Sequence, residues 1–76
     1  MNKPFDLSAI SMELLRARSI HPKAHNSPHE SYGIIKEEFS EFFDEVRKKR
    51  HNKPNMKKEL IQTAAMCIRA IEDLGL

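Results

Sequence analysis

The sequence predicts an all-α protein, a first helix followed by an antiparallel helical hairpin. Three segments carry apolar residues at helical spacing, no segment alternates as a half-buried strand does, and only two residues are glycine. The 76 residues form one domain, residues 1–76, whose core is thin for its surface. We therefore expect oligomerisation to complete a core that resembles a four-helix bundle.

The first helix is predicted over about residues 7–19. Asp6 or Ser8 is placed to cap its start, and Leu7, Ile10 and Leu14 form an apolar stripe. A loop over residues 20–26 then leads to the next cap.

The second helix is predicted over residues 28–50. It begins with Ser27-Pro28-His29-Glu30, a capping box with proline at the first helical position. A narrow arc of apolar side chains runs along it, and we expect this arc to be core: Ile35, Phe39, Phe42, Phe43 and Val46.

The third helix is predicted over residues 54–74, after a turn capped by Asn52 or Asn55 and before a stop at Gly75. Its apolar residues, Cys67 among them, extend almost all round, so we expect it to be buried on most sides, in part by another subunit. The short connection makes the second and third helices antiparallel neighbours.

Composition and charge exclude several classes of protein. No apolar run approaches the roughly 20 residues of a membrane span, and no hydrophobic signal region is present, so we expect a cytoplasmic protein. The net charge is +2, with an acidic stretch over residues 30–45 and a basic one over residues 47–58. The basic stretch has no interleaved aromatic residues, which disfavours nucleic-acid binding.

Two pairs of polar side chains suggest a metal site. Glu38 and Glu41 are three residues apart on the second helix, as Glu59 and Gln62 are on the third, so each pair shares a helix face. Facing each other across the hairpin, they would form an oxygen-rich pocket of the kind that Mg²⁺ prefers, and Mg²⁺ commonly brings a phosphate substrate.

The order and spacing of Glu37-Glu38-Phe39-Ser40-Glu41 and Glu59-Leu60-Ile61-Gln62 resemble the MazG-like all-α nucleoside triphosphate pyrophosphohydrolases. That family has an EExxE helix followed by an ExxD helix, and the resemblance covers about residues 30–74. It implies cleavage of a nucleoside triphosphate to the monophosphate and pyrophosphate. It also implies Mg²⁺ ligands at Glu38, Glu41 and Glu59, with Gln62 in the aspartate position.

The resemblance extends to further roles. Glu37 or Glu45 would orient the attacking water, and a group of cations after the second helix would meet the outer phosphates: Arg47, Lys48, Arg50 and Lys53. Fuller members carry a fourth helix, so a three-helix member is expected to complete its pocket as a homodimer or homotetramer. Short members of the family occur in phage genomes, so the resemblance leads us to expect a phage-like origin.

Other interpretations stay open at the level of sequence. Gln62 adds no charge, so the chain is alternatively a catalytically degenerate relative that binds nucleotides or serves in helical assembly. A plain interaction module that docks through its apolar third helix is a further alternative. Clustered glutamates and a basic helix end are also typical of solvated faces.

Overall fold

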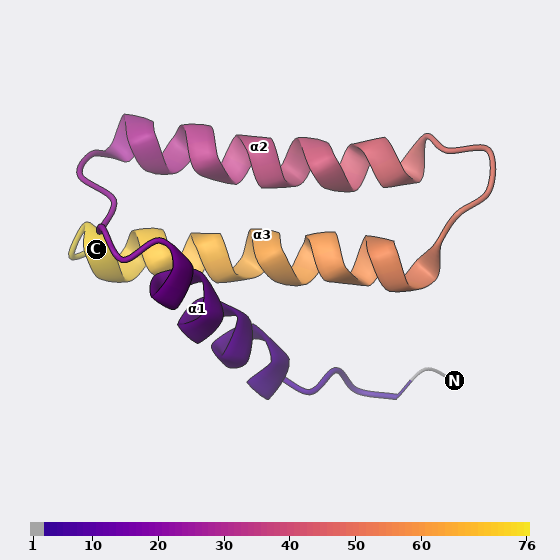
Figure 1. Cartoon of the computed structure of the whole chain (residues 1–76), viewed down its shortest axis with the longest axis horizontal. Helices are drawn as coiled ribbons and strands as arrows, with labels where there is room; N and C mark the ends of the chain where they lie inside the picture. Colours follow the sequence, from indigo (N-terminus) through magenta and orange to yellow (C-terminus); the bar gives the residue numbers. More distant parts are fainter. Residues whose placement is uncertain (1–2) are drawn as a thin grey trace.

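The computed structural model describes residues 3–76 and contains, over that range, the three helices α1 (Ser8–Ile20), α2 (Pro28–Val46) and α3 (Lys53–Asp73). The predicted all-α class is confirmed. Residues 1 and 2 of the predicted domain lie outside the described range. Figure 1 shows α2 and α3 as an antiparallel hairpin, with α1 crossing obliquely on the other side of α3.

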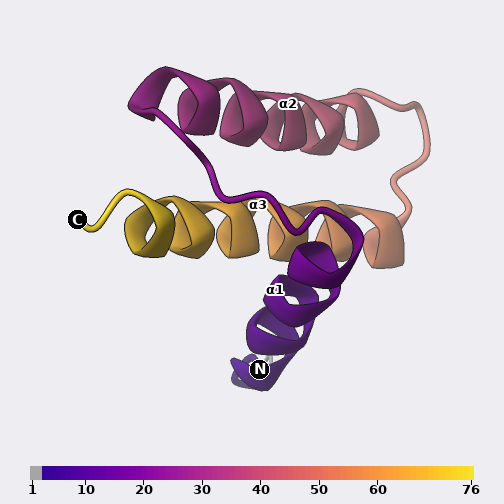
Figure 2. The same ribbon diagram turned by 60° about the vertical axis from the view of Figure 1, so that its left-hand side comes forward.

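Helix α3 is the centre of the fold, because it packs against both other helices, whereas α1 and α2 do not pack together over the described residues. The buried core joins Ala65 and Met66 of α3 to Ala17 of α1, and partly buried residues of α1 and α2 surround it. Figure 2 shows the same order of helices, with the α1–α2 connection running along α3. The helices thus form a single layer with α3 in the middle.

Helix α2 starts where the sequence predicts. Ser27 Oγ accepts a hydrogen bond from the Glu30 N–H at 3.1 Å, and Pro28 occupies the first turn. The Glu30 carboxylate accepts from the N–H of Asn26 at 3.3 Å, one residue before the partner in a standard capping box. The entry of the chain into α2 is therefore fixed on both sides of the cap.

Replacing Ser27 by Ala is expected to lower the free energy of unfolding by about 1 kcal/mol, because the Glu30 N–H loses its partner. Urea titration followed by circular dichroism measures this change. Ser40→Ala, on an exposed turn of the same helix, is the matched control and should cost nothing. Equal stability of the two variants would show that the cap is dispensable.

Helix α2 ends at Val46, four residues before the predicted end. No apolar side chain follows Val46 in the basic run of residues 47–50, so packing no longer offsets the repulsion between adjacent cations. His51 Nε2 lies 2.7 Å from the carbonyl oxygen of Val46 and closes the helix end.

The ends of α3 follow standard caps. Asn52 Oδ1 accepts from the Asn55 N–H at 3.0 Å, which assigns the cap to the first of the two predicted asparagines. Gly75 has a φ of 67°, and the Leu76 N–H donates to the Ile71 carbonyl at 3.0 Å in a Schellman motif. The glycine stop is confirmed.

Two expectations about burial are wrong for the single chain. Phe39 and Phe43 are 58% and 55% exposed, and Cys67 is exposed as well. The reason is geometric: the three helices form a single layer, and no further helix of the described chain covers the side of it on which these residues lie. Among residues 3–76, no helix has the length and apolar character needed to cross a membrane.

Candidate metal centre

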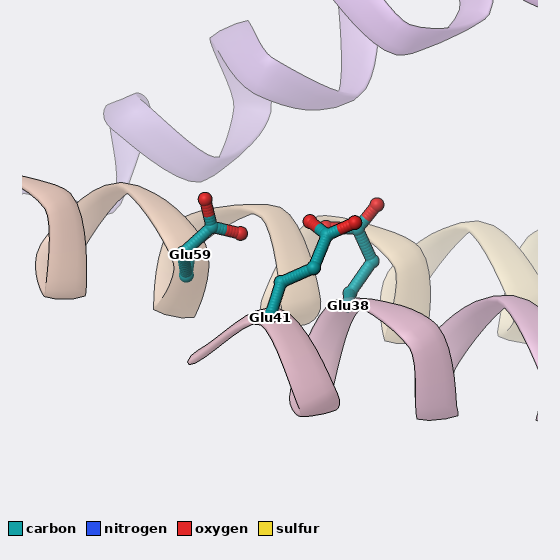
Figure 3. Close-up of side chains that lie close together, drawn as sticks. All are labelled: Glu38, Glu41 and Glu59. Atoms are coloured by element: carbon teal, nitrogen blue, oxygen red, sulfur yellow. The ribbon is translucent and has the colours of Figure 1, made fainter. Parts of the chain in front are cut away.

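Three carboxylates from two helices converge at the middle of the hairpin. Glu38 and Glu41 lie one turn apart on α2, and Glu59 faces them from α3 (Figure 3). One oxygen from each of the three carboxylates lies within 4.8 Å of the other two. All three side chains are partly buried, and the antiparallel pairing of α2 with α3 brings them to the same height.

Gln62 completes the set at the fourth predicted position, one turn after Glu59 on α3. With its amide nitrogen turned toward the carboxylates, Gln62 donates to Glu38 Oε2 at 3.3 Å and to Glu59 Oε2 at 3.2 Å. In this orientation the amide is a donor that offsets carboxylate charge. Turning the amide by half a rotation would instead present its oxygen to a cation.

Crowding and burial raise the proton affinity of the cluster. Burial, followed by the charges of Glu41 and Glu59, raises the pKa of Glu38 from 4.5 to about 7. Burial also raises the pKa of Glu59, followed by its hydrogen bond with Glu41. The negative charge of the cluster is therefore incompletely balanced near neutral pH, and this favours the binding of either a proton or a metal cation.

The pH dependence of stability follows from this shift. The folded Glu38 holds a proton up to about pH 7, whereas the unfolded carboxyl releases it near 4.5, so the folded state binds more protons between these values. In metal-free buffer, the contribution of Glu38 to the free energy of unfolding should thus increase as the pH falls from about 8 to 5. The carboxylates that face Glu38 come from all three helices: Glu13, Glu37, Glu41 and Glu59.

Thermal melts of the wild type and Glu38→Gln in EDTA at both pH values measure this contribution. The difference in Tm between the two proteins should shrink toward acid pH, because the variant lacks the titrating group. A difference that stays constant across the range would contradict the proposed shift.

A cavity of about 520 Å³ adjoins the carboxylates in the groove between α1 and α2. Its floor is α3, and the α1–α2 connection closes one end. This volume suits a small-molecule ligand. Carboxylates, cations, imidazoles and apolar side chains line it together: Glu13, Arg16, Ala17, Ile20, His21, Lys23, His25, Glu30, Ile34, Glu37, Glu38, Gln62, Met66 and Arg69.

Helix α1 contributes Glu13 and Arg16 to this cavity, and neither was predicted from the sequence. The Glu13 side chain is only 14% exposed and pairs with Arg16 at 2.7 Å. The Glu13 charge also adds to the raised pKa of Glu38. Their position follows from the angle at which α1 crosses α3, which the spacing of Ile10, Leu14 and Ala17 does not specify.

Arg69 fixes the wall formed by the α1–α2 connection. Its side chain is 3% exposed and donates to the carbonyl oxygens of His21 and of Lys23, the latter at 2.7 Å. Its Nε also donates to Asp73 Oδ2 at 3.3 Å. A single arginine within an apolar helix, four residues before an aspartate, was the available sequence signal for this buried pair.

Asp73 and His25 extend the same network. Asp73 accepts from the His25 N–H at 2.9 Å and pairs with Arg18 at 2.9 Å. The His25 N–H, followed by the arginines, lowers the pKa of Asp73 to about 2. The buried His25 ring lies 2.7 Å from Ser31 Oγ, so the connection is held by both α2 and α3.

The two carboxylates predicted to orient water lie on either side of the cluster on α2. Glu37 is exposed and lines the cavity. Glu45 accepts from Lys48 at 2.8 Å, which lowers its pKa, and its other oxygen is buried without a hydrogen-bond partner over the described residues.

The predicted phosphate-binding cations lie around the α2–α3 turn: Arg47, Lys48, Arg50 and Lys53. Arg47 pairs with Asp44 at 3.2 Å, and none of the four lines the 520 Å³ cavity. Their contact with phosphate stays a prediction. The cations that do line this cavity are Arg16, Lys23 and Arg69.

Comparisons of the chain with protein families, with curated proteins and with solved structures found no match.

Proposed function

We propose that the protein is a Mg²⁺-dependent nucleotide pyrophosphohydrolase of the MazG-like kind, which converts a nucleoside triphosphate to the monophosphate and pyrophosphate. The observation that carries this proposal is the convergence of Glu38, Glu41 and Glu59 within 4.8 Å. The adjoining cavity and the EExxE and ExxQ spacing support it. We also propose that the nucleotide is bound by a homo-oligomer, a dimer or a tetramer.

The residues of the cluster fit Mg²⁺. They offer three hard carboxylate oxygens and an amide oxygen, and the raised pKa values of Glu38 and Glu59 indicate charge that a cation would neutralise. Mg²⁺ bound there would neutralise phosphate charge and activate a water. Glu37 and Glu45 would orient that water from either side of the ligands.

The cavity has cations suited to the anionic part of a nucleotide. Arg16 and Lys23 line it from α1 and from the α1–α2 connection. Guanidinium and ammonium groups bind phosphate oxygens by charge-assisted hydrogen bonds. We therefore include both among the proposed phosphate contacts, together with the predicted cations at the α2–α3 turn.

A panel of nucleoside triphosphates incubated with Mg²⁺ tests the proposal through pyrophosphate release. We expect release from at least one nucleotide, and none in EDTA. If no nucleotide releases pyrophosphate at high protein concentration, the proposed enzymatic activity is refuted.

A second function is favoured by the position of Gln62. With its amide nitrogen turned toward the carboxylates, Gln62 donates to Glu38 and Glu59, which offsets part of the charge that a cation would neutralise. A relative that keeps the fold but has weak metal affinity would use such an amide, and would act in nucleotide binding or helical assembly.

Replacing Gln62 by Asp distinguishes the two functions. The added carboxylate should raise Mg²⁺ affinity about tenfold and lower the metal-free Tm, because the cluster gains charge and loses a donor. Gln62→Asn is the matched control, since it has the length of Asp and keeps the amide. Equal Mg²⁺ affinity of these two variants would show that position 62 does not face the metal.

The rate of pyrophosphate release by Gln62→Asp also distinguishes an active enzyme from a protein that only binds nucleotides. Pyrophosphate release that rises from a measurable wild-type rate supports the enzyme. Release that appears only in Gln62→Asp shows that the natural chain is a degenerate binder.

A further inference from the structure

One face of the helical layer is apolar and exposed, on the side away from the cavity. Tyr32, Phe39 and Phe43 recur at spacings of seven and four along α2, so they share one side of that helix. Leu60, Cys67 and Ile71 have the same spacings along α3. These six residues, which we call the back face, are all exposed, and none lines the 520 Å³ cavity.

Helix geometry places both stripes on the same side of the layer. Phe43 follows Glu38 by five residues and Ile71 follows Gln62 by nine, which rotates them about 140° and about 180° from the cavity side. Figure 1 shows α2 and α3 side by side. The rotations given above therefore place the two stripes next to each other on one side of this pair.

The exposed area of the chain exceeds what a monomer of its mass exposes. It amounts to 6071 Å² for 8.8 kDa. A folded monomer of that mass exposes roughly 4,800 Å², so the surplus is about 1,300 Å². Obligate homodimers bury a total of about 2,000–5,000 Å² over their two subunits. If each of two copies buried its surplus, the total would lie within that range.

The arrangement of the helices also indicates that a second subunit covers part of this surface. Stable domains bury a core between two layers of secondary structure, and this chain has one layer. The six back-face residues carry no charge, as expected at the centre of an interface between subunits. Lys36 lies between Tyr32 and Phe39 on the same side of α2, with its ammonium 5.8 Å from the centre of the Tyr32 ring.

We propose that the back face binds the back face of a second copy of this chain, related by a two-fold axis, so that α2 and α3 of both copies form one core. The hairpins run antiparallel across the interface, because this end of each hairpin carries seven cations that would otherwise meet. Four lie in the α2–α3 turn and three in the first two turns of α3: Arg47, Lys48, Lys49, Arg50, Lys53, Lys57 and Lys58. The cavities and carboxylate clusters remain on the two outer faces.

The wild-type protein gives the first test. Sedimentation equilibrium should give twice the 8.8 kDa chain mass. Tm should rise with protein concentration between about 1 and 100 µM, because association stabilises the folded state. The Cys67 thiol should react slowly in the dimer and faster on dilution. A monomer throughout this range, with a freely reactive thiol, would overturn the proposal.

Charged substitutions locate the interface. Phe39→Glu and Ile71→Glu should each weaken dimerisation by about 100-fold and expose Cys67. Met12→Glu is the matched control, because Met12 is 68% exposed on α1 and lies outside the back face. Loss of helicity in the back-face variants alone would also support the proposal, since a charge at a position that stays exposed does not unfold a helix. Dimers as tight as those of Met12→Glu would overturn it, and this test does not depend on the proposed enzymatic activity.

Discussion

Replacing Glu38 by Gln is expected to abolish the Mg²⁺ response of the protein and to reduce pyrophosphate release by at least about 100-fold. Glu38 is the carboxylate of the cluster whose pKa is raised to about 7, by burial and then by the charges of Glu41 and Glu59. A metal ion contributes several kcal/mol of transition-state stabilisation, and about 1.4 kcal/mol corresponds to tenfold in rate.

The same substitution should raise the Tm of the metal-free protein at neutral pH. The neutral amide removes a charge that burial, and then the neighbouring carboxylates, make unfavourable, and this cost appears as the raised pKa of Glu38, about 7. The variant should therefore be more stable and less active, which a purely structural role for Glu38 does not predict.

Thermal melts with and without Mg²⁺, together with the rate of pyrophosphate release, measure both effects. Asp44→Asn is the matched control, because Asp44 is an exposed carboxylate on the same helix outside the cluster. An Mg²⁺-induced rise in Tm that persists in Glu38→Gln would contradict the assignment of Glu38 as a ligand.

Replacing Arg69 by Met is expected to lower the free energy of unfolding by about 3–5 kcal/mol, the usual cost of removing one partner of a buried ion pair. Methionine fills a similar volume but leaves the Asp73 carboxylate with fewer donors. The carbonyls of His21 and Lys23 also lose their hydrogen bonds. In a domain of this size the loss is a large fraction of the total stability.

Urea titration followed by circular dichroism measures the effect. Arg16→Met is the matched control. The ion pair between Arg16 and Glu13 is partly solvated, so this substitution should lower the free energy of unfolding by only about 0–1 kcal/mol. A similar cost for the two variants would show that the network beneath the α1–α2 connection does not stabilise the fold.

The helices were predictable from local chemistry. Ser27, Asn52 and Gly75 mark boundaries because each satisfies backbone groups within a few residues, and such signals are fully contained in the sequence. The early end of α2 was not predicted, because it depends on which side chains find packing partners beyond Val46.

The candidate site was predictable in part. Spacing of three residues on two antiparallel helices was sufficient to bring Glu38, Glu41 and Glu59 together. The cavity, with Glu13 of α1 and the connection held by Arg69, depends on tertiary geometry that no local pattern encodes. An apolar arc likewise shows which side of a helix prefers burial, but not whether its own chain covers it. That is why Phe39 and Cys67 were expected in the core.

Calorimetric titration of the nucleotide-free protein with Mg²⁺ at pH 7, repeated in buffers of different ionisation enthalpy, measures directly whether the three carboxylates bind a metal ion. Because Glu38 has a pKa of about 7, binding at the cluster should release about half a proton, and this release should disappear at higher pH. We expect saturable binding with proton release in the wild type and neither in Glu38→Gln. No binding in the wild type, or equal binding in both proteins, would contradict the assignment of these carboxylates to a metal centre.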